Sequence, residues 1–280
     1  MIGLILEDGG MRCAFTAGVL DCWMEQGIRF TDVYGVSAGA CQACSYLCDQ
    51  PGRGLRVWLN YLDDPRFCSM KSLITTGDLF GAELNYNLVP KQLDPLHNDV
   101  FLKSGARFTA VLTDIETGRP VYYPIKDMFD DIKAIQATAS LPLISRAVDI
   151  RGHKYLDGGV TDSIPLRKAV ADGHDKNVLV LTQAPGYRKE PNKALGMMRL
   201  RYARYPKLVE AVARRHTMYN DTLTYIEQQR AAGKAFIIQP EATPEVGRIE
   251  KDPGKLKRLH DIGFSTALRQ LDALRDFLRS

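Results

Sequence analysis

No apolar run in the sequence approaches the ~20 residues that a membrane-spanning helix needs. No positively charged stretch precedes the first apolar segment, residues 2–6, so we expect no signal peptide. Net charge is only +4, from 37 basic and 33 acidic residues, which argues against a protein that must bind nucleic acid. Internal repeats and low-complexity tracts are also lacking. These absences indicate a cytoplasmic protein that could at most rest on the inner face of a membrane.

Cysteine is absent after position 68. The six cysteines stand at positions 13, 22, 41, 44, 48 and 68, and in a cytosolic chain we expect them to remain unpaired. Cys41, Cys44 and Cys48 have helical spacing and therefore share one face of a helix. A metal site would need Cys13 or Cys68 as a further ligand, whereas small buried thiols that pack a helix on a sheet are commoner. We expect neither a metal nor a cofactor.

The first predicted strand, residues 3–7, lacks both common nucleotide motifs, G-x-G-x-x-G and G-K-[ST]. Instead, Asp8-Gly9-Gly10-Met11-Arg12 follows the strand and leads into a predicted amphipathic helix that starts at Ala14 and ends near Gly27. A Gly-Gly turn between a strand and a helix can direct backbone N–H groups toward one point, where they hold an anion or an oxyanion. A simple tight turn is the alternative.

The chain is organised around Gly35-Val36-Ser37-Ala38-Gly39. A short β-type run, residues 31–34, precedes this segment, and a helix of small apolar residues, 40–47, follows it. A strand, a sharp turn with a central serine and a helix form a nucleophile elbow, in which glycines relieve crowding on both sides. The hydroxyl then lies at the positive end of the helix. Ser37 is therefore the candidate nucleophile, although G-x-S-x-G also occurs by chance.

A nucleophilic serine needs a base within hydrogen-bond reach. Asp157-Gly158-Gly159 ends a predicted hairpin, 147–150 with 153–156, and its glycines leave room for a close partner. An ordinary Asp-Gly turn is the alternative. Three histidines follow Asp157, but none lies in a glycine-rich or strand-end context, and we expect them at the surface: His174, His216 and His260.

The remaining pattern predicts a three-layer α/β/α sandwich around a mainly parallel sheet. Residues 1–185 form the predicted core and 186–280 a basic helical extension. Within residues 51–106, which read as helices and loops, 67–88 could line a substrate entrance. The other expected elements are a hairpin of 107–113 and 120–124, helices at 129–140, 165–171 and 256–278, and strands at 178–182 and 235–239, the last returning to the sheet.

Residues 187–233 carry most of the basic side chains of the extension. They are Arg188, Lys189, Lys193, Arg199, Arg201, Arg204, Lys207, Arg214 and Arg215, interleaved with Met197, Met198, Leu200, Tyr202 and Tyr205. A solvated helical face is the simplest interpretation of such a run. Contact with an anionic membrane is the alternative.

Three segments in this order resemble the patatin-like phospholipases: Asp8-Gly-Gly-Met-Arg12, Gly35-Val-Ser-Ala-Gly39 and Asp157-Gly-Gly159. Residues 137–142, Ala-Thr-Ala-Ser-Leu-Pro, are similar to the small-residue segment that precedes the Asp-Gly motif in that family. The resemblance covers roughly residues 3–185 and is greatest to the bacterial branch with a helical C-terminal extension.

The resemblance implies a patatin-like fold and a serine lipid acyl hydrolase that uses a Ser–Asp dyad without histidine. Ser37 would be the nucleophile and Asp157 the base. The backbone N–H groups of Gly9, Gly10 and Met11 would form the oxyanion hole. Phospholipids or other acyl esters would be the substrates, and an acyltransferase or a catalytically weak lipid-binding protein are the alternatives. The supporting motif residues would be Asp8, Arg12, Gly35, Gly39, Gly158 and Gly159.

The glycine loop departs from the usual family pattern, G-G-G-x-[RK]-G, at two positions. Asp8 replaces the first glycine and Cys13 the last. A carboxylate that faced a nascent oxyanion would oppose its charge, so we expect the Asp8 side chain to turn away from the hole. Arg12, a cation at a helix start, should have a carboxylate or carbonyl partner.

Overall fold

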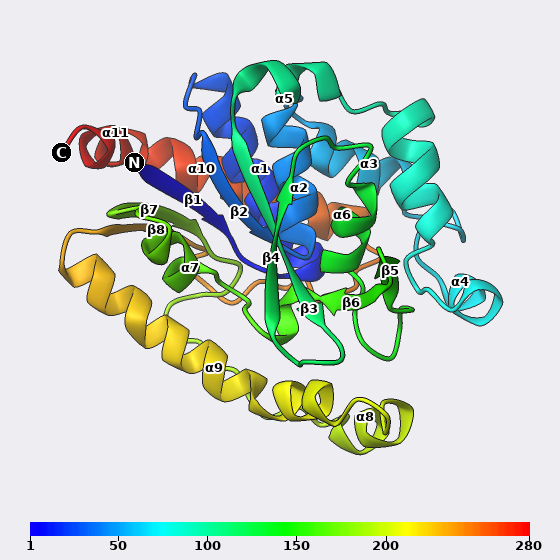
Figure 1. Cartoon of the computed structure of the whole chain (residues 1–280). Coiled ribbons are helices and arrows are strands. Elements are labelled where there is room, and N and C mark those ends of the chain that lie inside the picture. The colour runs from blue at the N-terminus through cyan, green and yellow to red at the C-terminus, as the bar shows by residue number, and fades with distance from the viewer.

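The computed structural model describes all 280 residues and contains one eight-stranded sheet. Its order is β5-β6-β3-β2-β1-β7-β8, with β4 also paired to β3 (Figure 1). Five neighbouring strands run parallel: β3, β2, β1, β7 and β8. The strands β4, β5 and β6 add antiparallel pairs at the β3 side of the sheet. The strands are β1 Ile2–Leu6, β2 Asp32–Val36, β3 Arg107–Asp114, β4 Pro120–Ile125, β5 Val148–Ile150, β6 His153–Asp157, β7 Lys176–Val180 and β8 Ala235–Ile238.

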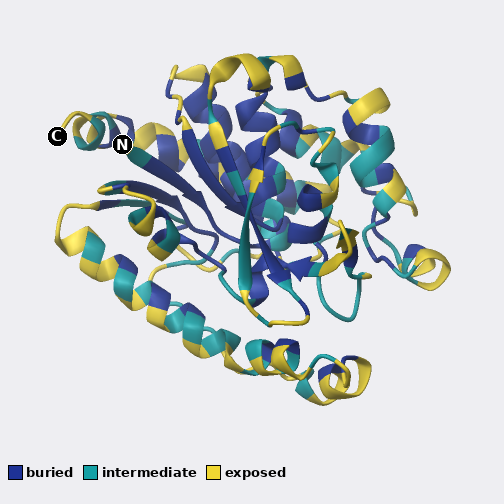
Figure 2. Ribbon diagram, viewed as in Figure 1, coloured by how far each residue is buried: buried dark blue, intermediate teal, exposed yellow.

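Helices cover both faces of this sheet, which confirms the predicted three layers. Successive side chains of a strand point to opposite faces: Leu4 and Leu6 pack in the larger core cluster, and Ile5 packs in a second cluster on the other face. The larger cluster includes side chains of α1 (Ala14–Glu25), α2 (Ala38–Leu47) and α10 (Pro253–Arg269), and the second includes those of α7 (Leu166–Ala171) and α9 (Pro206–Ala231). The central strands are buried, and exposed residues lie on the outer helices (Figure 2).

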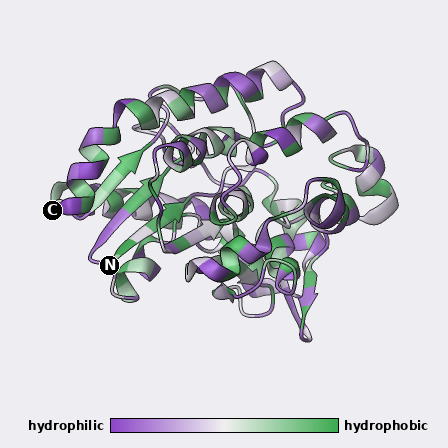
Figure 3. Ribbon diagram, turned by 90° about the horizontal axis from the view of Figure 1, so that it is seen from above, coloured by the Kyte–Doolittle hydropathy of each residue, from purple (hydrophilic) through white to green (hydrophobic).

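The other helical segments surround the ends of the sheet. They are α3 Arg53–Tyr61, α4 Met70–Thr76, α5 Asn98–Ser104, α6 Ile132–Thr138, α8 Leu195–Arg201, α11 Leu271–Arg279, the short turns η1 Gly10–Cys13 and η3 Gly158–Val160, and the wider helix η2 Leu84–Leu93. The long helices alternate between hydrophilic and hydrophobic positions, as their amphipathic patterns require (Figure 3). No helix is both long and apolar enough to cross a membrane.

The C-terminal extension packs on both faces of the core. β8 pairs with β7 in parallel, as predicted for the late strand. On the opposite side α10 lies directly on α1: a Cβ atom at Gly18 would stand 2.0 Å from the carbonyl oxygen of His260, and one at Gly263 would stand 2.1 Å from that of Phe15. The backbones of the two helices therefore meet at glycine.

The prediction of a single helix over 256–278 is wrong. The structure has two helices, α10 and α11, which separate at Gln270. No proline or glycine marks this break. α10 packs along α1, whereas α11 places Phe277 against Phe236 of β8, with ring centroids 5.6 Å apart. These two contacts require different helix directions.

Candidate active site

The turn between β2 and α2 has the geometry of a nucleophile elbow. Ser37 has φ 55° and ψ −129°, a left-handed conformation that is rare for a residue other than glycine. A Cβ atom at Gly35 would stand 2.6 Å from Cα of Ala40, and one at Gly39 would stand 2.5 Å from the carbonyl oxygen of Glu7. Only glycine fits at either position, which is the reason for the G-x-S-x-G spacing.

Ser37 and Asp157 are in hydrogen-bond contact, as the sequence predicts. The Ser37 hydroxyl donates to Oδ2 of Asp157 at 2.6 Å, although the two residues are 120 positions apart. The second carboxylate oxygen accepts the Gly159 N–H at 2.7 Å. A Cβ atom at Gly158 would stand 1.9 Å from the carbonyl oxygen of Val111, so this glycine allows η3 to approach β3.

Two contacts of Thr138 hold the elbow in place. The Ser37 N–H donates to the Thr138 hydroxyl at 3.0 Å, and this hydroxyl donates in turn to the Val111 carbonyl. Thr138 lies within the family-like segment 137–142, but the sequence alone assigned it no role.

Burial raises the pKa of Asp157 to about 6, and the charge of Asp8 adds to this rise. A carboxylate with such a pKa is a stronger base than a solvated aspartate.

The Asp8 carboxylate is buried and points toward Gly159 and the C-terminal extension. Its Oδ2 pairs with Arg215 of α9 at 2.6 Å and lies 3.6 Å from the Arg248 guanidinium. A Cβ atom at Gly159 would stand 2.7 Å from the same oxygen. Burial alone would raise the pKa of Asp8, but the charges of Arg215, Lys189 and Arg248 outweigh it and hold the pKa below its usual range. The carboxylate is thus ionised, and the nearby positive charges balance its negative charge.

The expected partner of Arg12 is missing, so that prediction is wrong. Arg12 forms no hydrogen bond or ion pair in the structure, and its Nε is buried without a partner. Asp8 is the nearest suitable carboxylate along the chain, but Arg215 already occupies it. Neither Arg215 nor Arg248 was assigned to the site from sequence, because no local motif surrounds them.

The histidines do not take part in the dyad. None forms a hydrogen bond with Ser37 or Asp157. The expected surface position is wrong for His174, which is only 2% exposed, and for His260, whose side chain is mostly buried against Asp21. The His174 ring packs edge-on against Tyr34 and faces Asp32, so this histidine stabilises the opposite end of β2 from the serine.

The Gly-Gly loop leaves two backbone donors free. Gly9 and Gly10 N–H groups make no hydrogen bond within the protein, whereas the Met11 N–H donates to the Arg248 carbonyl at 3.0 Å. Gly10 has φ +58°, and a Cβ atom there would stand 2.5 Å from that same carbonyl oxygen. Of the three donors expected in an oxyanion hole, the geometry leaves Gly9 and Gly10 available and gives Met11 another partner.

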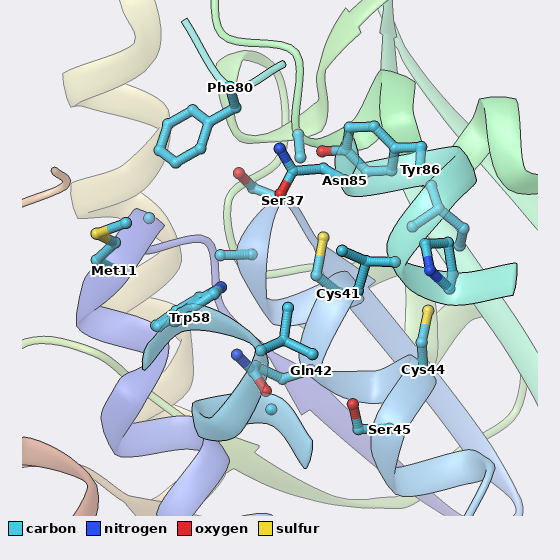
Figure 4. Close-up of a pocket in the computed structure, with 18 of the residues that line it drawn as sticks. Met11, Ser37, Cys41, Gln42, Cys44, Ser45, Trp58, Phe80, Asn85 and Tyr86 are labelled. Carbon is cyan, nitrogen blue, oxygen red and sulfur yellow. The ribbon is translucent and has the colours of Figure 1, made fainter. Parts of the chain in front are cut away.

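A narrow, mostly apolar cavity of about 140 Å³ opens beside Ser37. The rings of Trp58, Phe80 and Tyr86 and the sulfur of Cys41 lie around the serine (Figure 4). Two of these aromatic residues come from 67–88, the segment expected to line an entrance. Burial raises the pKa of the Cys41 thiol to about 12, which keeps it protonated and poorly nucleophilic.

The site thus holds a serine in a strained backbone conformation that is hydrogen-bonded to a buried aspartate, and no histidine joins the pair. Residues 4–170 match the patatin-like phospholipase family, and the chain belongs to that family. Residues 205–279 match a domain of unknown function, DUF6363. This second segment supplies both Arg215 and Arg248.

Two individual proteins are similar to the chain. The uncharacterized protein YjjU of Escherichia coli (strain K12) is 30% identical over 251 residues, which cover 85% of this chain and 68% of YjjU. The crystal structure of VipD from Legionella pneumophila is similar at a TM-score of 0.47 and 12% identity, covering 97% of this chain and 66% of VipD.

Proposed function

We propose that the protein is a serine lipid acyl hydrolase that cleaves carboxylic esters through an acyl-serine intermediate. The observation that carries this proposal is the 2.6 Å hydrogen bond between the Ser37 hydroxyl and the buried Asp157 carboxylate. Membership of the patatin-like phospholipase family supports a lipid ester as the substrate.

In the proposed reaction, Ser37 Oγ attacks the ester carbonyl carbon while its proton passes to Oδ2 of Asp157. The N–H groups of Gly9 and Gly10 donate to the oxyanion that forms. The ester C–O bond then breaks, Asp157 returns the proton to the leaving alcohol, and the acyl group remains on Ser37. A water molecule then attacks the acyl-serine and gives a proton to Asp157. The bond between the acyl carbon and Ser37 Oγ breaks, Asp157 returns the proton to Oγ, and the fatty acid leaves.

The apolar cavity is the proposed acyl site. Its aromatic and aliphatic lining suits a hydrocarbon chain, because burial of apolar surface contributes ~0.8 kcal/mol for each CH₂ group. Trp58 and Phe80 would contact the chain, and Ser37 would face the ester carbon. The compensated charge of Asp8 favours an active enzyme over a catalytically weak lipid-binding protein, because Arg215 neutralises the carboxylate.

A fluorophosphonate probe, which modifies activated serines, tests this proposal. We expect wild-type protein to be labelled and to release fatty acid from acyl esters, and Ser37→Ala to do neither. Ser45→Ala is the matched control, since Ser45 lines the same cavity but does not contact Asp157. Absent labelling of the wild type, or labelling that survives in Ser37→Ala, would favour the lipid-binding protein. Transfer of the acyl group to an added alcohol instead of water would identify an acyltransferase.

We also propose that α8 contacts an anionic membrane. Met197 and Leu200 are 61% and 84% exposed on this arginine-rich helix. The neighbouring Tyr202 hydroxyl accepts the Leu143 N–H, so α8 adjoins the loop before Asp157. We expect Leu200→Asp to weaken sedimentation with phosphatidylglycerol vesicles and Leu102→Asp, an exposed leucine on α5, to have no effect. Equal sedimentation of both variants would contradict the contact.

A further inference from the structure

A second cavity, of about 450 Å³, is lined by residues of the C-terminal extension and is strongly basic. Its charged lining consists of Arg188, Lys189, Arg215, His216, Arg248 and a single acid, Glu190. The Glu190 side chain is 78% exposed and pairs with Lys193 outside the cavity. The cavity thus has an excess of positive charge that no carboxylate of its own lining offsets.

Several donors in this cavity have no acceptor. The Lys189 ammonium forms no hydrogen bond or ion pair in the structure and lies over two aromatic rings, 4.1 Å from the centroid of Tyr219 and 5.9 Å from that of Tyr187. The Arg248 guanidinium donates no hydrogen bond, and its nearest carboxylate oxygen, on Asp8, is 3.6 Å away. Arg215 is the one cation of the group with a close carboxylate partner, since Asp8 binds it at 2.6 Å.

Burial makes the charge of Lys189 costly. Burial lowers the pKa of Lys189 to about 8; the charge of Asp8 opposes this decrease, whereas the positive charges of Arg215 and Arg248 add to it. The deeper carboxyl of Glu7 forms no ion pair with either cation and accepts hydrogen bonds from Tyr219 and Thr182. A ligand with at least two negative oxygens would satisfy Lys189 and Arg248 together.

The basic cavity also meets the reaction site. Arg248 lines both this cavity and the apolar cavity of Ser37. Arg215, Arg248 and Asn192 also line a smaller cavity that reaches Asp157. A molecule whose ester carbon stood at Ser37 could therefore extend its polar end toward Lys189 while its acyl chain lay in the apolar cavity.

We propose that the basic cavity binds a phosphate group, and that this group belongs to the headgroup of the lipid whose ester is cleaved at Ser37. The identity of the phosphate as a headgroup rests on the hydrolase function proposed above. The phosphate oxygens would accept hydrogen bonds from Lys189 and Arg248, and Arg188 and His216 would line the same space. The C-terminal segment would then select the substrate that the family core cleaves.

Direct binding tests the phosphate site without turnover. Glycerol 3-phosphate is titrated into the Ser37→Ala protein by calorimetry, with glycerol as the uncharged control. We expect glycerol 3-phosphate alone to bind. Lys189→Gln and Arg248→Gln should each weaken it ten-fold or more, whereas Lys193→Gln and Arg214→Gln, which remove exposed cations nearby, should leave its affinity unchanged. Absent binding, or equal affinity in all the variants, would overturn the proposal.

Substrate selection identifies the source of the phosphate. Wild-type protein is given phosphatidic acid and diacylglycerol, which differ only by the phosphate, in the same detergent micelles. We expect kcat/KM to be at least ten-fold higher for phosphatidic acid, and glycerol 3-phosphate to inhibit competitively. These two measurements need no variant, so they hold even where a substitution impairs folding.

The outcomes separate this inference from the hydrolase function. Hydrolysis of both lipids at equal rates would refute the headgroup assignment while leaving the hydrolase intact. Binding of glycerol 3-phosphate with noncompetitive inhibition would identify a free phosphate ligand instead of a headgroup and would refute the assignment too. Binding without cleavage of any ester would refute the hydrolase function and leave a phosphate site.

Discussion

At the scale of single residues, the ionisation of Asp157 should control the pH dependence of the reaction. The proposed base acts only when it has lost its proton, so kcat/KM for a neutral acyl ester should rise with pH and level off above a pKa of about 6. A solvated aspartate would give ~3.9. Arg215→Gln removes a positive charge and leaves that of Asp8, so the rise should move to higher pH.

The control for this profile is Arg214→Gln, which removes the same charge from an exposed side chain on the same helix. Its profile should match that of the wild type. A pH dependence that is the same in Arg215→Gln would show that Asp157 is not the titrating base.

Gly159 provides a steric test of the same site. A methyl group there would stand 2.7 Å from Oδ2 of Asp8 and 3.0 Å from Oδ1 of Asp157, so one or both carboxylates must move. We expect Gly159→Ala to lower kcat/KM by about 100-fold, the order of loss for a displaced reacting group. Gly196→Ala, in α8 with no atom within 4 Å, should retain activity. Full activity of Gly159→Ala would show that the carboxylates can shift freely.

Ser37 and Asp157 could be predicted from the sequence because each lies in a short glycine motif. Those glycines are needed where the backbone packs closely, so the steric requirement is visible in the local sequence. The sequence did not predict Arg215 or Arg248. Their contacts with Asp8 depend on how α9 and the loop after β8 cross the sheet, which no local spacing encodes. The alternation along α9 also gives no reason why Arg215 turns inward while its neighbour Arg214 pairs with Glu210 outside.

At the scale of elements, the packing of α10 on α1 includes a titratable pair. His260 Nε2 and Asp21 Oδ2 are 2.8 Å apart and mostly buried. Burial would lower the pKa of His260, but the hydrogen bond to Asp21 outweighs it and raises the pKa. A histidine with a raised pKa in the folded state contributes stability that is complete below its unfolded pKa of ~6.5 and is lost as pH rises through the folded pKa.

We therefore expect Asp21→Asn to lower the free energy of unfolding by ~1–3 kcal/mol at pH 6 and by clearly less at pH 9, measured by urea unfolding. Asp261→Asn is the control, because this exposed carboxylate also contacts His260, at 3.3 Å. It should change stability little at either pH. An equal loss in Asp21→Asn at both pH values would exclude the charged pair.

Strands and hairpins were predictable to within two residues or so at most ends, because their apolar runs and turn residues are local. The break between α10 and α11 was not, since it arises from contacts with two different elements, α1 and β8. Local pattern thus determined which elements exist, and long-range packing determined where the last helix bends.

At the scale of the whole molecule, the predicted core and extension share one sheet and one hydrophobic interior. β8 covers the edge of β7, and α10 covers α1 at Gly18. We expect a single cooperative urea transition for the full chain, and a chain that ends at residue 185 should not fold, because α1 would expose a broad apolar face. Two separate transitions, or a folded 1–185 fragment, would show that the parts are independent domains.

The ion pair between Asp8 and Arg215 also limits how the parts of the chain can be exchanged. Asp8 stands where the family usually has glycine, and its partner lies 207 positions away in a segment that matches a different domain. Removal of either residue would leave its buried partner without its close counter-charge, a destabilising change. The loop and the extension are therefore energetically coupled, and a graft of one onto a related protein should carry the other with it.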